Sequence, residues 1–482
     1  MPSRRTHVTE SIAQSELAVA LAQLRAELDV PESFAPEVLA EAESARAADP
    51  GTDLRELAFV TIDPPGSTDL DQALCIERLV LGYLVHYAIA DVPGWVLPGG
   101  AVDLEARRRG QTLYAADGRV PLHPVVLSED RASLLPGADR SAFVWAFELD
   151  ELGEVTSTRL TRAKVRSREQ LTYDEAQARI DAGDGDSSLA LLREVGLLRI
   201  ELERARGGAS LNSPDEEIVR TEGGGYSLER RHPLPVEEWN AQLSLMTGMA
   251  AAQLMLDARV GVLRTLPKPT DDRIAAFRAQ SRALGRPWPE TISYGEYLRG
   301  LDRADPASLA VMQAASGLFR GAGYLAVDGE VPPDPIQSAL AAPYAHVTAP
   351  LRRLIDRWGL VVCEALCAGR DVPEWARSSL RELPSLMGAS SQRASRLDAE
   401  SIARVEAALL STRVGERFTA TVLEVRAERA VLQLADPAVT ATCPAPAGVR
   451  AGTELDVELL AADIATGTIE FRAAAAAPVA PA

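Results

Sequence analysis

The sequence predicts an α+β protein with a mixed sheet, covering helices and a small C-terminal barrel. Strand patterns dominate residues 53–166, where short apolar runs alternate with turn residues. Helical patterns dominate residues 173–411, and five short alternating segments follow them. A block of strands followed by a block of helices is typical of α+β architecture.

The composition is that of a globular protein with an acidic surface. The chain has 482 residues, of which 46% are hydrophobic and 25% charged, so it can bury a large core in more than one domain. Its net charge of −19 argues against a protein coated with nucleic-acid-binding surface. Lysine occurs only at Lys164 and Lys268, so cationic contacts must come from arginine, which suits bidentate phosphate recognition. The composition is therefore still compatible with a local channel lined by arginines.

Cysteine content and the first residues predict a cytoplasmic location. The four cysteines are too few and too scattered for a disulfide framework. Cys363 and Cys367 lie four apart in a helical pattern, which favours core packing over a metal pair. No apolar run approaches the length of a membrane span, and the first residues lack a signal-peptide core.

Four regions are expected along the chain. The first contains two helices, from about Glu10 to Leu28 and from about Pro31 to Ala47, which form either a helical cap or a helix-turn-helix module. The helical module, the large α+β domain, the five-stranded OB-type barrel and the disordered Ala/Pro tail are expected at residues 1–50, 51–412, 413–473 and 474–482.

The strands and helices of the large region follow from hydrophobic periodicity. Apolar runs predict buried strands at Ala58–Ile62 and Leu81–Asp91, and a hairpin formed by Val144–Leu149 and Glu154–Val165. A short helix at Ala101–Gly110 is expected to end in an arginine cluster. Further helices are expected at about 173–205, 236–258, 270–284, 306–320 and 351–368, and a turn at 223–225 joins two short strands.

A first chemical cluster lies just after the strand that ends at Ile62. Its carboxylates are Asp63, Asp69 and Asp71, and an extended segment at 68–73 would place the last two on one face. Three converging carboxylates repel one another unless a cation lies between them. Oxygen ligands suit magnesium or manganese. The alternatives are an ordinary Asp-rich turn and a calcium loop, although the glutamate of an EF-hand is missing.

A second cluster surrounds the start of the helix expected at 351–368. Pro350 is predicted at the first helical position, and apolar residues between Leu351 and Leu366 mark one buried stripe. Arg352, Arg353 and Arg357 fall off that stripe. Arginines at a helix N-terminus form a phosphate site. The alternative is a surface helix whose arginines face water.

Shorter motifs link these two clusters. They are His86–Val92, Pro98–Ala106, Arg109–Gly110, Pro121–Pro124, Leu127–Ser128, Ser133–Leu134, Asp139–Arg140 and Thr348–Arg353. In this order they resemble the RNase II/RNase R family of exoribonucleases, which carry an RNB catalytic domain, over about Asp53 to Leu410. A chance match of so many motifs in one order is improbable. The C-terminal barrel resembles the RNA-binding OB module that ends these enzymes.

The resemblance implies an RNB-type mixed sheet wrapped by helices and a magnesium-dependent enzyme, with manganese as the alternative cation. It implies processive 3′-to-5′ hydrolysis of RNA with release of nucleoside 5′-monophosphates. The implied partner is single-stranded RNA, with or without adjacent duplex. The implied enzyme is a monomer that does not bind a membrane. By position, the metal ligands are Asp63, Asp69, Asp71 and Gln72. The catalytic residues are Asp71 and Arg352, and the RNA-binding residues are Tyr114, Arg352 and Arg353.

Several positions depart from the family pattern. The fourth aspartate is Gln72, which is expected to hold a second ion more weakly. A serine is replaced by Ala349, which loses a capping hydroxyl if Pro350 begins the helix. The two N-terminal cold-shock modules of the family do not fit into the first fifty residues. These departures leave the alternative of a catalytically weak or inactive RNB-fold protein that acts as an RNA-binding regulatory protein.

Overall fold

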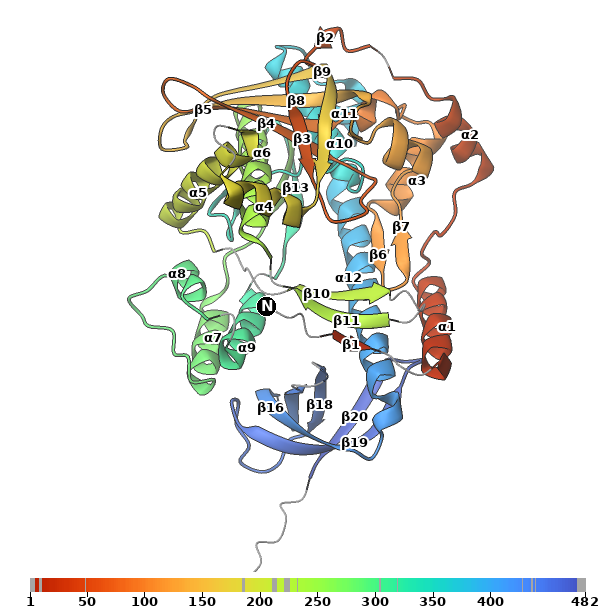
Figure 1. Cartoon of the computed structure of the whole chain (residues 1–482), viewed down its shortest axis with the longest axis vertical. Coiled ribbons are helices and arrows are strands. Elements are labelled where there is room, and N and C mark those ends of the chain that lie inside the picture. The colour runs from red at the N-terminus through yellow and green to blue at the C-terminus, as the bar shows by residue number, and fades with distance from the viewer. Residues whose placement is uncertain are drawn as a thin grey trace, which may run out of the picture.

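The computed structural model describes residues 5–7, 11–47, 49–183, 187–209, 215–220, 226–231, 233–302, 305–318, 320–426, 428–434, 437 and 439–474. A six-stranded sheet with covering helices and a closed five-stranded barrel are joined by one long helix (Figure 1). The fold is thus the predicted mixture of helices and strands. The glycine turn at 223–225 and the tail beyond residue 474 lie outside the described residues.

The sheet is mixed and curls back on itself. Its order is β2-β9-β3-β4-β5-β8, and β8 also pairs with β9. Strands β2 and β3 run parallel to β9, while the other neighbours are antiparallel. The strands are β2 (Thr52–Asp53), β3 (Phe59–Ile62), β4 (Gln72–Arg78), β5 (Tyr83–Ala90), β8 (Asp139–Leu149) and β9 (Val155–Leu171). The strands expected at 58–62 and 81–91 are confirmed, and the expected hairpin is longer at its open end.

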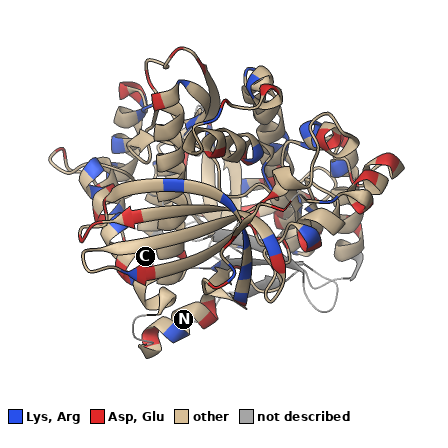
Figure 2. Ribbon diagram, turned by 90° about the horizontal axis from the view of Figure 1, so that it is seen from above, with Lys and Arg blue, Asp and Glu red and all other residues tan. Residues whose placement is uncertain are grey.

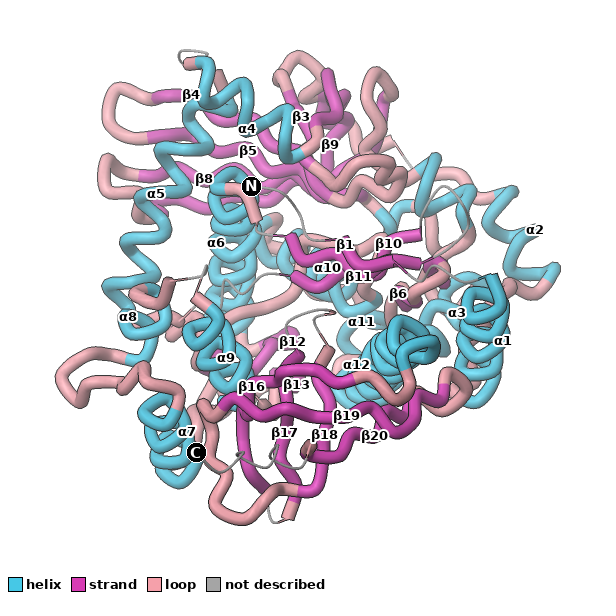
Figure 3. Tube along the Cα trace, turned by 60° about the horizontal axis from the view of Figure 1, so that its bottom comes forward, coloured by secondary structure: helices cyan, strands magenta, loops and turns pink. Residues whose placement is uncertain are grey.

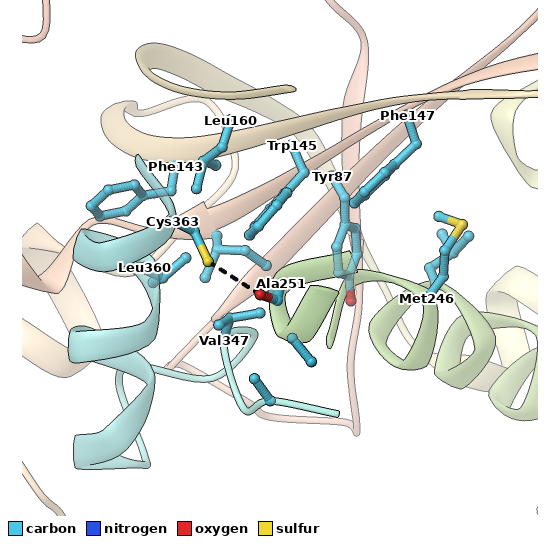
Figure 4. Close-up of a cluster of buried hydrophobic side chains, with 14 of the residues drawn as sticks. Tyr87, Phe143, Trp145, Phe147, Leu160, Met246, Ala251, Val347, Leu360 and Cys363 are labelled. Carbon is cyan, nitrogen blue, oxygen red and sulfur yellow. Dashed lines mark hydrogen bonds between the residues drawn. The ribbon is translucent and has the colours of Figure 1, made fainter. Parts of the chain in front are cut away.

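Large side chains alternate with small ones along β5, which gives the sheet two different faces. Tyr87 lies in a core formed with helices, whereas Ala88 and Ala90 face a second, smaller core. Figure 4 shows Tyr87, Met246 and Cys363 among the side chains of the first core. The Sγ of Cys363 lies 3.8 Å from the carbonyl oxygen of Ala251, so the expected core packing of this cysteine is confirmed. The helices around this core are α4 (Tyr173–Ala182), α5 (Ser188–Arg206), α6 (Pro235–Ala258), α10 (Leu354–Cys367) and α11 (Glu374–Ser379).

The two N-terminal helices pack on different parts of the chain. In α1 (Ser11–Glu27), Leu17 and Leu21 are buried against the long helix α12 (Leu383–Leu410). Helix α2 (Pro36–Ser44) packs on α3 (Ala101–Arg109). The carboxylate of Glu41 accepts hydrogen bonds from the first backbone N–H groups of α3, at 2.6 Å from Ala101 and 3.2 Å from Val102. A carboxylate is stabilised there because those N–H groups have no partner within their own helix.

The five strands predicted for the C-terminal barrel are confirmed. They close in the order β16-β17-β18-β20-β19, and Figure 3 shows them beside the lower end of α12. Phe418 and Phe471 are buried inside, with ring centroids 5.8 Å apart, so neither forms an outer stacking surface. The strands are β16 (Arg417–Arg426), β17 (Arg429–Leu434), β18 (Thr440–Pro444), β19 (Glu454–Asp463) and β20 (Thr468–Ala473).

Smaller elements complete the molecule. Helices α7 (Asp271–Ala283), α8 (Tyr294–Arg299) and α9 (Pro306–Ala315) form an aromatic cluster that also contacts Leu423 of the barrel. The remaining strands are β1 (Arg5–His7), β6 (Leu113–Ala115), β7 (Gly118–Val120), β10 (Asp215–Arg220), β11 (Tyr226–Arg231), β12 (Val260–Thr265), β13 (Gly323–Asp328), β14 (Ile336–Gln337) and β15 (Ala342–Pro343). Acidic and basic residues are interspersed along the ribbon (Figure 2). Among the described residues, no helix has the length and apolar character needed to cross a bilayer.

Candidate active site

Asp63 lies where β3 ends and is fixed there by the neighbouring strand. Its backbone N–H donates to the carbonyl of Leu171, the last residue of β9, at 3.0 Å. The Oδ2 atom is buried and has no hydrogen-bond partner among the described residues. Burial raises the pKa of Asp63 to about 6, although the charge of Arg352 acts in the opposite direction. The carboxyl group therefore lacks full compensation for its negative charge.

Asp71 immediately precedes β4 and faces the arginine cluster. Its Oδ1 accepts a hydrogen bond of 2.8 Å from the backbone N–H of Leu351, 280 residues further along the chain. Its Oδ2 lies 3.3 Å from Nε of Arg352. Burial raises the pKa of Asp71 to about 8, against the opposing charge of Arg352. The structure thus joins one predicted catalytic carboxylate to the predicted catalytic arginine.

Asp69 and Asp71 lie in the segment that precedes β4, which begins at Gln72. The carboxylate of Asp69 forms an ion pair with Arg119 of β7. Of the segment expected to be extended at 68–73, Gln72 and Ala73 belong to a strand. Among the described residues, no group of three or more Asp, Glu, His or Cys side chains has an arrangement that could hold a metal.

Gln72 is the first residue of β4 and points at the second cluster. Its Nε2 atom donates a hydrogen bond to the backbone carbonyl of Thr348. A carbonyl oxygen only accepts, so the nitrogen end of the amide must face it. Gln72 therefore ties the aspartate loop to the loop that carries the arginines.

The arginine loop (residues 348–353) contains a hydrogen-bonded turn, in which the N–H groups of Arg352 and Arg353 donate to the carbonyl of Ala349 at 3.2 and 2.9 Å, but this turn is not part of the helix. Helix α10 begins at Leu354 with Arg353 as its N-cap residue, so the placement of Pro350 at the first helical position is wrong. The loop's backbone also bonds to other elements, since Leu354 donates to the carbonyl of Gly110 at 3.0 Å and Arg352 accepts from Thr112 at 2.9 Å. These tertiary hydrogen bonds hold the segment between the turn and the first residue of α10.

The three arginines of this cluster have three different environments. The side chain of Arg352 is 47% exposed beside Asp71. Arg353 forms a bidentate ion pair with the buried Asp356, at 2.9 and 2.8 Å. Arg357 is buried and paired with Asp103 of α3, so the expectation that it lies off the buried stripe is wrong. The same Asp356 accepts a hydrogen bond of 2.7 Å from the backbone N–H of Ala349. A carboxylate of α10 therefore binds the backbone at the position where the family has a serine.

Tyr114 lies beside both clusters on the hairpin formed by β6 and β7. It pairs across that hairpin with Arg119 and is 54% exposed. Burial of its hydroxyl group raises the pKa of Tyr114, and the charges of Arg352, Asp69 and Asp71 also act on it. An exposed ring at this position suits base stacking.

Arg119 is a site residue that the sequence analysis does not identify, and Thr348 enters that analysis only as the first residue of the motif Thr348–Arg353. Arg119 forms ion pairs with Asp69 and, at 2.9 Å, with Glu129. The Asp117–Gly118 dipeptide is a hairpin-turn signal, but a two-residue loop of these residues would pair Arg119 with Ala116, whereas the structure pairs it with Tyr114. Thr348 contributes a backbone carbonyl, for which no side-chain pattern exists.

Comparison with protein families matches two of them to this chain. The RNB domain matches residues 51–362. The RNase II-type exonuclease C-terminal S1 domain matches residues 416–474, which contain the barrel.

Individual relatives show the same relationship. The chain is 30% identical over 330 residues to the human exosome complex exonuclease RRP44, which covers 63% of this chain and 33% of the relative. It is 43% identical over 366 residues to DIS3-like exonuclease 2 of Arabidopsis thaliana, covering 67% and 33%, and to an Arabidopsis protein named inactive exonuclease DIS3L2 with the same figures. The chain thus spans about one third of the length of these relatives.

Among solved structures, RNase R of Mycoplasma genitalium in complex with ribose-methylated single-stranded RNA has the same fold. Its TM-score is 0.85 at 17% sequence identity, and the match covers 95% of this chain and 78% of that one.

Proposed function

Because the chain belongs to the RNB-domain family and ends in an RNase II-type S1 domain, we propose that it is a 3′-to-5′ exoribonuclease. The proposed reaction hydrolyses RNA phosphodiesters from the 3′ end and releases nucleoside 5′-monophosphates. One observation carries this proposal, namely the contact between the buried carboxylate of Asp71 and the half-exposed Arg352. A guanidinium group with an exposed side can bind a phosphate while its other side stays fixed by a carboxylate.

Magnesium, with manganese as the alternative, fits the donors of this site. Asp63 and Asp71 are hard oxygen ligands, and their raised pKa values show that their negative charge is poorly compensated. The buried Oδ2 of Asp63, which has no hydrogen-bond partner in the described part of the chain, supports the same assignment. Asp63 and Asp71 would hold the ion, with Asp69 and Gln72 nearby. A bound divalent cation supplies a water molecule of lowered pKa and neutralises charge on the leaving oxygen.

The residues of the chain itself bind and orient the RNA. Arg352 binds the scissile phosphate and stabilises the negative charge that grows on it during hydrolysis. Arg353 adds positive potential beside the path, although its guanidinium group is bound to Asp356. The exposed ring of Tyr114 stacks on the terminal base, and such stacking accepts any base. The proposed partner is therefore single-stranded RNA of any sequence, bound by a monomer in the cytoplasm.

The direct test uses RNA labelled at its 5′ end, both single-stranded and as a duplex with a single-stranded 3′ tail. With magnesium, we expect a ladder that shortens from the 3′ end on a sequencing gel, and nucleoside 5′-monophosphates as products. The Asp71→Asn variant should lose cleavage and keep RNA binding, because the amide retains an oxygen for the N–H of Leu351. Intact RNA with the wild-type protein, beside a control nuclease that degrades it, would contradict the proposal.

The second candidate function is that of an RNA-binding regulatory protein with the RNB fold and with weak or no catalytic activity. It is favoured by the neutral Gln72 and by the pairing of Asp69 with Arg119, which both reduce the negative charge available to metal. One relative is named as inactive. RNA binding with neither turnover nor calorimetric magnesium uptake would support this candidate over the first.

A further inference from the structure

We infer that this site takes a single divalent cation, because protein groups occupy the positions that would ligate a second one. The inference rests on the proposed function and makes it more specific. Hydrolysis of phosphodiesters is commonly assisted by two ions a few ångströms apart, held by a shared set of carboxylates. Here Asp69 is paired with the guanidinium of Arg119, and the fourth predicted ligand is the neutral Gln72, whose amide is bound to the carbonyl of Thr348.

The first of these groups is the guanidinium of Arg119, which lies between two carboxylates. It pairs with Asp69 and with Glu129, the latter at 2.9 Å, and donates to the hydroxyl oxygen of Thr68 at 2.9 Å. That hydroxyl in turn donates to Glu129 at 2.7 Å, so the network is closed. The side chains of Arg119, Asp69 and Glu129 are 31%, 15% and 22% exposed, which limits screening by water. Arg119 thus neutralises Asp69 with a charge that is permanent and fixed in position.

The second group is the amide of Gln72, which meets the carbonyl of Thr348. A carboxylate directed at this carbonyl would bring two oxygen atoms together, and they would repel unless a cation lay between them. The neutral amide makes the contact without any cation. The hydrogen bond of 2.8 Å from Leu351 to Asp71 joins the same two loops a second time. The geometry of the loops is therefore already held in place by the protein.

Two carboxylates stay available for an ion. Asp63 has a buried oxygen without a hydrogen-bond partner among the described residues, and Asp71 shares its charge with one half-exposed arginine. Together with Arg352 these two carboxylates carry a net charge of −1, which a single divalent cation more than offsets. A second ion would have to displace Arg119 from Asp69 and would meet a neutral amide at position 72.

The experiment counts manganese ions bound to the full chain by electron paramagnetic resonance. Manganese chloride is titrated into the protein with adenosine 5′-monophosphate present, because this stable nucleotide supplies a phosphate group. For the wild type we expect one ion per chain with the spectrum of an isolated ion. For the double variant Gln72→Asp/Arg119→Gln we expect two ions per chain and the spectrum of a spin-coupled pair.

Gln111→Asp/Arg119→Gln is the matched control. Gln111 also donates its amide to a backbone carbonyl, that of Ser390 at 3.4 Å, so the exchange adds the same charge in a similar setting. We expect one ion for this control. Two coupled ions in the wild type, no bound ion in the wild type, or a count that stays at one in the Gln72→Asp/Arg119→Gln variant would overturn the inference.

Cleavage is measured separately on the same wild-type preparation. One bound ion without RNA cleavage would leave the inference standing and contradict the proposed function. Cleavage with two coupled ions would do the reverse.

Discussion

Arg352 and Asp71 each change the chemistry of the other. The carboxylate is buried and its pKa lies at about 8, while the arginine beside it is half exposed. The arginine can therefore carry two roles, since it partly compensates a buried acid and presents its outer side to a substrate phosphate. A lysine has the same charge but lacks the planar fork needed for both contacts at once.

The Arg352→Ala variant should lower kcat by roughly 10²–10³-fold, the usual effect of removing one donor that stabilises transition-state charge. Arg352→Lys should recover only part of this loss, because it restores charge without the fork. Steady-state kinetics on single-stranded RNA measures both. Arg108→Ala removes an arginine that is 54% exposed on α3 and should leave kcat unchanged. Equal effects of Arg352→Ala and Arg108→Ala would remove Arg352 from the mechanism.

His123 should make the protein sensitive to acid. It is buried without a hydrogen-bond partner for either ring nitrogen among the described residues, and burial lowers its pKa to about 3. The unfolded chain binds this proton near pH 6.5 and the folded chain does not, so stability is full above 6.5 and is lost as pH falls toward 3. In urea unfolding, the wild type should lose more stability between pH 7 and pH 4 than His123→Leu. Parallel losses in the two proteins would contradict this assignment.

At the scale of elements, a buried ion pair locks α10 to α3. Arg357 and Asp103 are 1% and 0% exposed, and they are 254 residues apart in the chain. Arg357 also donates to the carbonyl of Val96 at 2.8 Å. Because the arginine loop leads directly into α10, this pair fixes the direction in which the chain passes from the loop into the helix.

The Arg357→Ala variant should therefore reduce the free energy of unfolding by about 3–5 kcal/mol, because Asp103 is left buried without its main partner. The replacement of both partners by leucine should cost less, since no uncompensated charge remains. Arg370→Ala, which breaks a pair in which the arginine is 58% exposed, should cost less than about 1 kcal/mol. Urea unfolding of the variants measures all of these values. A double variant as unstable as Arg357→Ala would argue against the charge explanation.

At the scale of the whole molecule, α1 joins the barrel to the rest of the chain. Leu17 and Leu21 of α1 share one buried cluster with Val405 and Leu409 of α12 and with Ile464, which lies between β19 and β20. The N-terminal helix is therefore expected to stabilise the contact between the barrel and the end of α12 that adjoins it.

Leu17→Ala should reduce the free energy of unfolding by about 2–5 kcal/mol, the usual cost of truncating a fully buried leucine. Val19→Ala on the same helix removes a side chain that is 68% exposed, and it should change stability by less than about 0.5 kcal/mol. Chemical unfolding followed by circular dichroism compares the two. Similar losses for both variants would show that the buried face of α1 does not stabilise the barrel end of the molecule.

The sequence alone determined most elements and both chemical clusters. Apolar runs identified β3 and β5, and alternation identified all five barrel strands, because the period of a strand is visible within a few residues. The tertiary structure decided what the clusters contact. Arg119 reaches Asp69 across 50 residues and Arg357 reaches Asp103 across 254, and local periodicity carries no record of such partners. The start of α10 was decided in the same way, since the N–H of Leu354 bonds to Gly110 and that of Leu351 bonds to Asp71, both far away in the sequence.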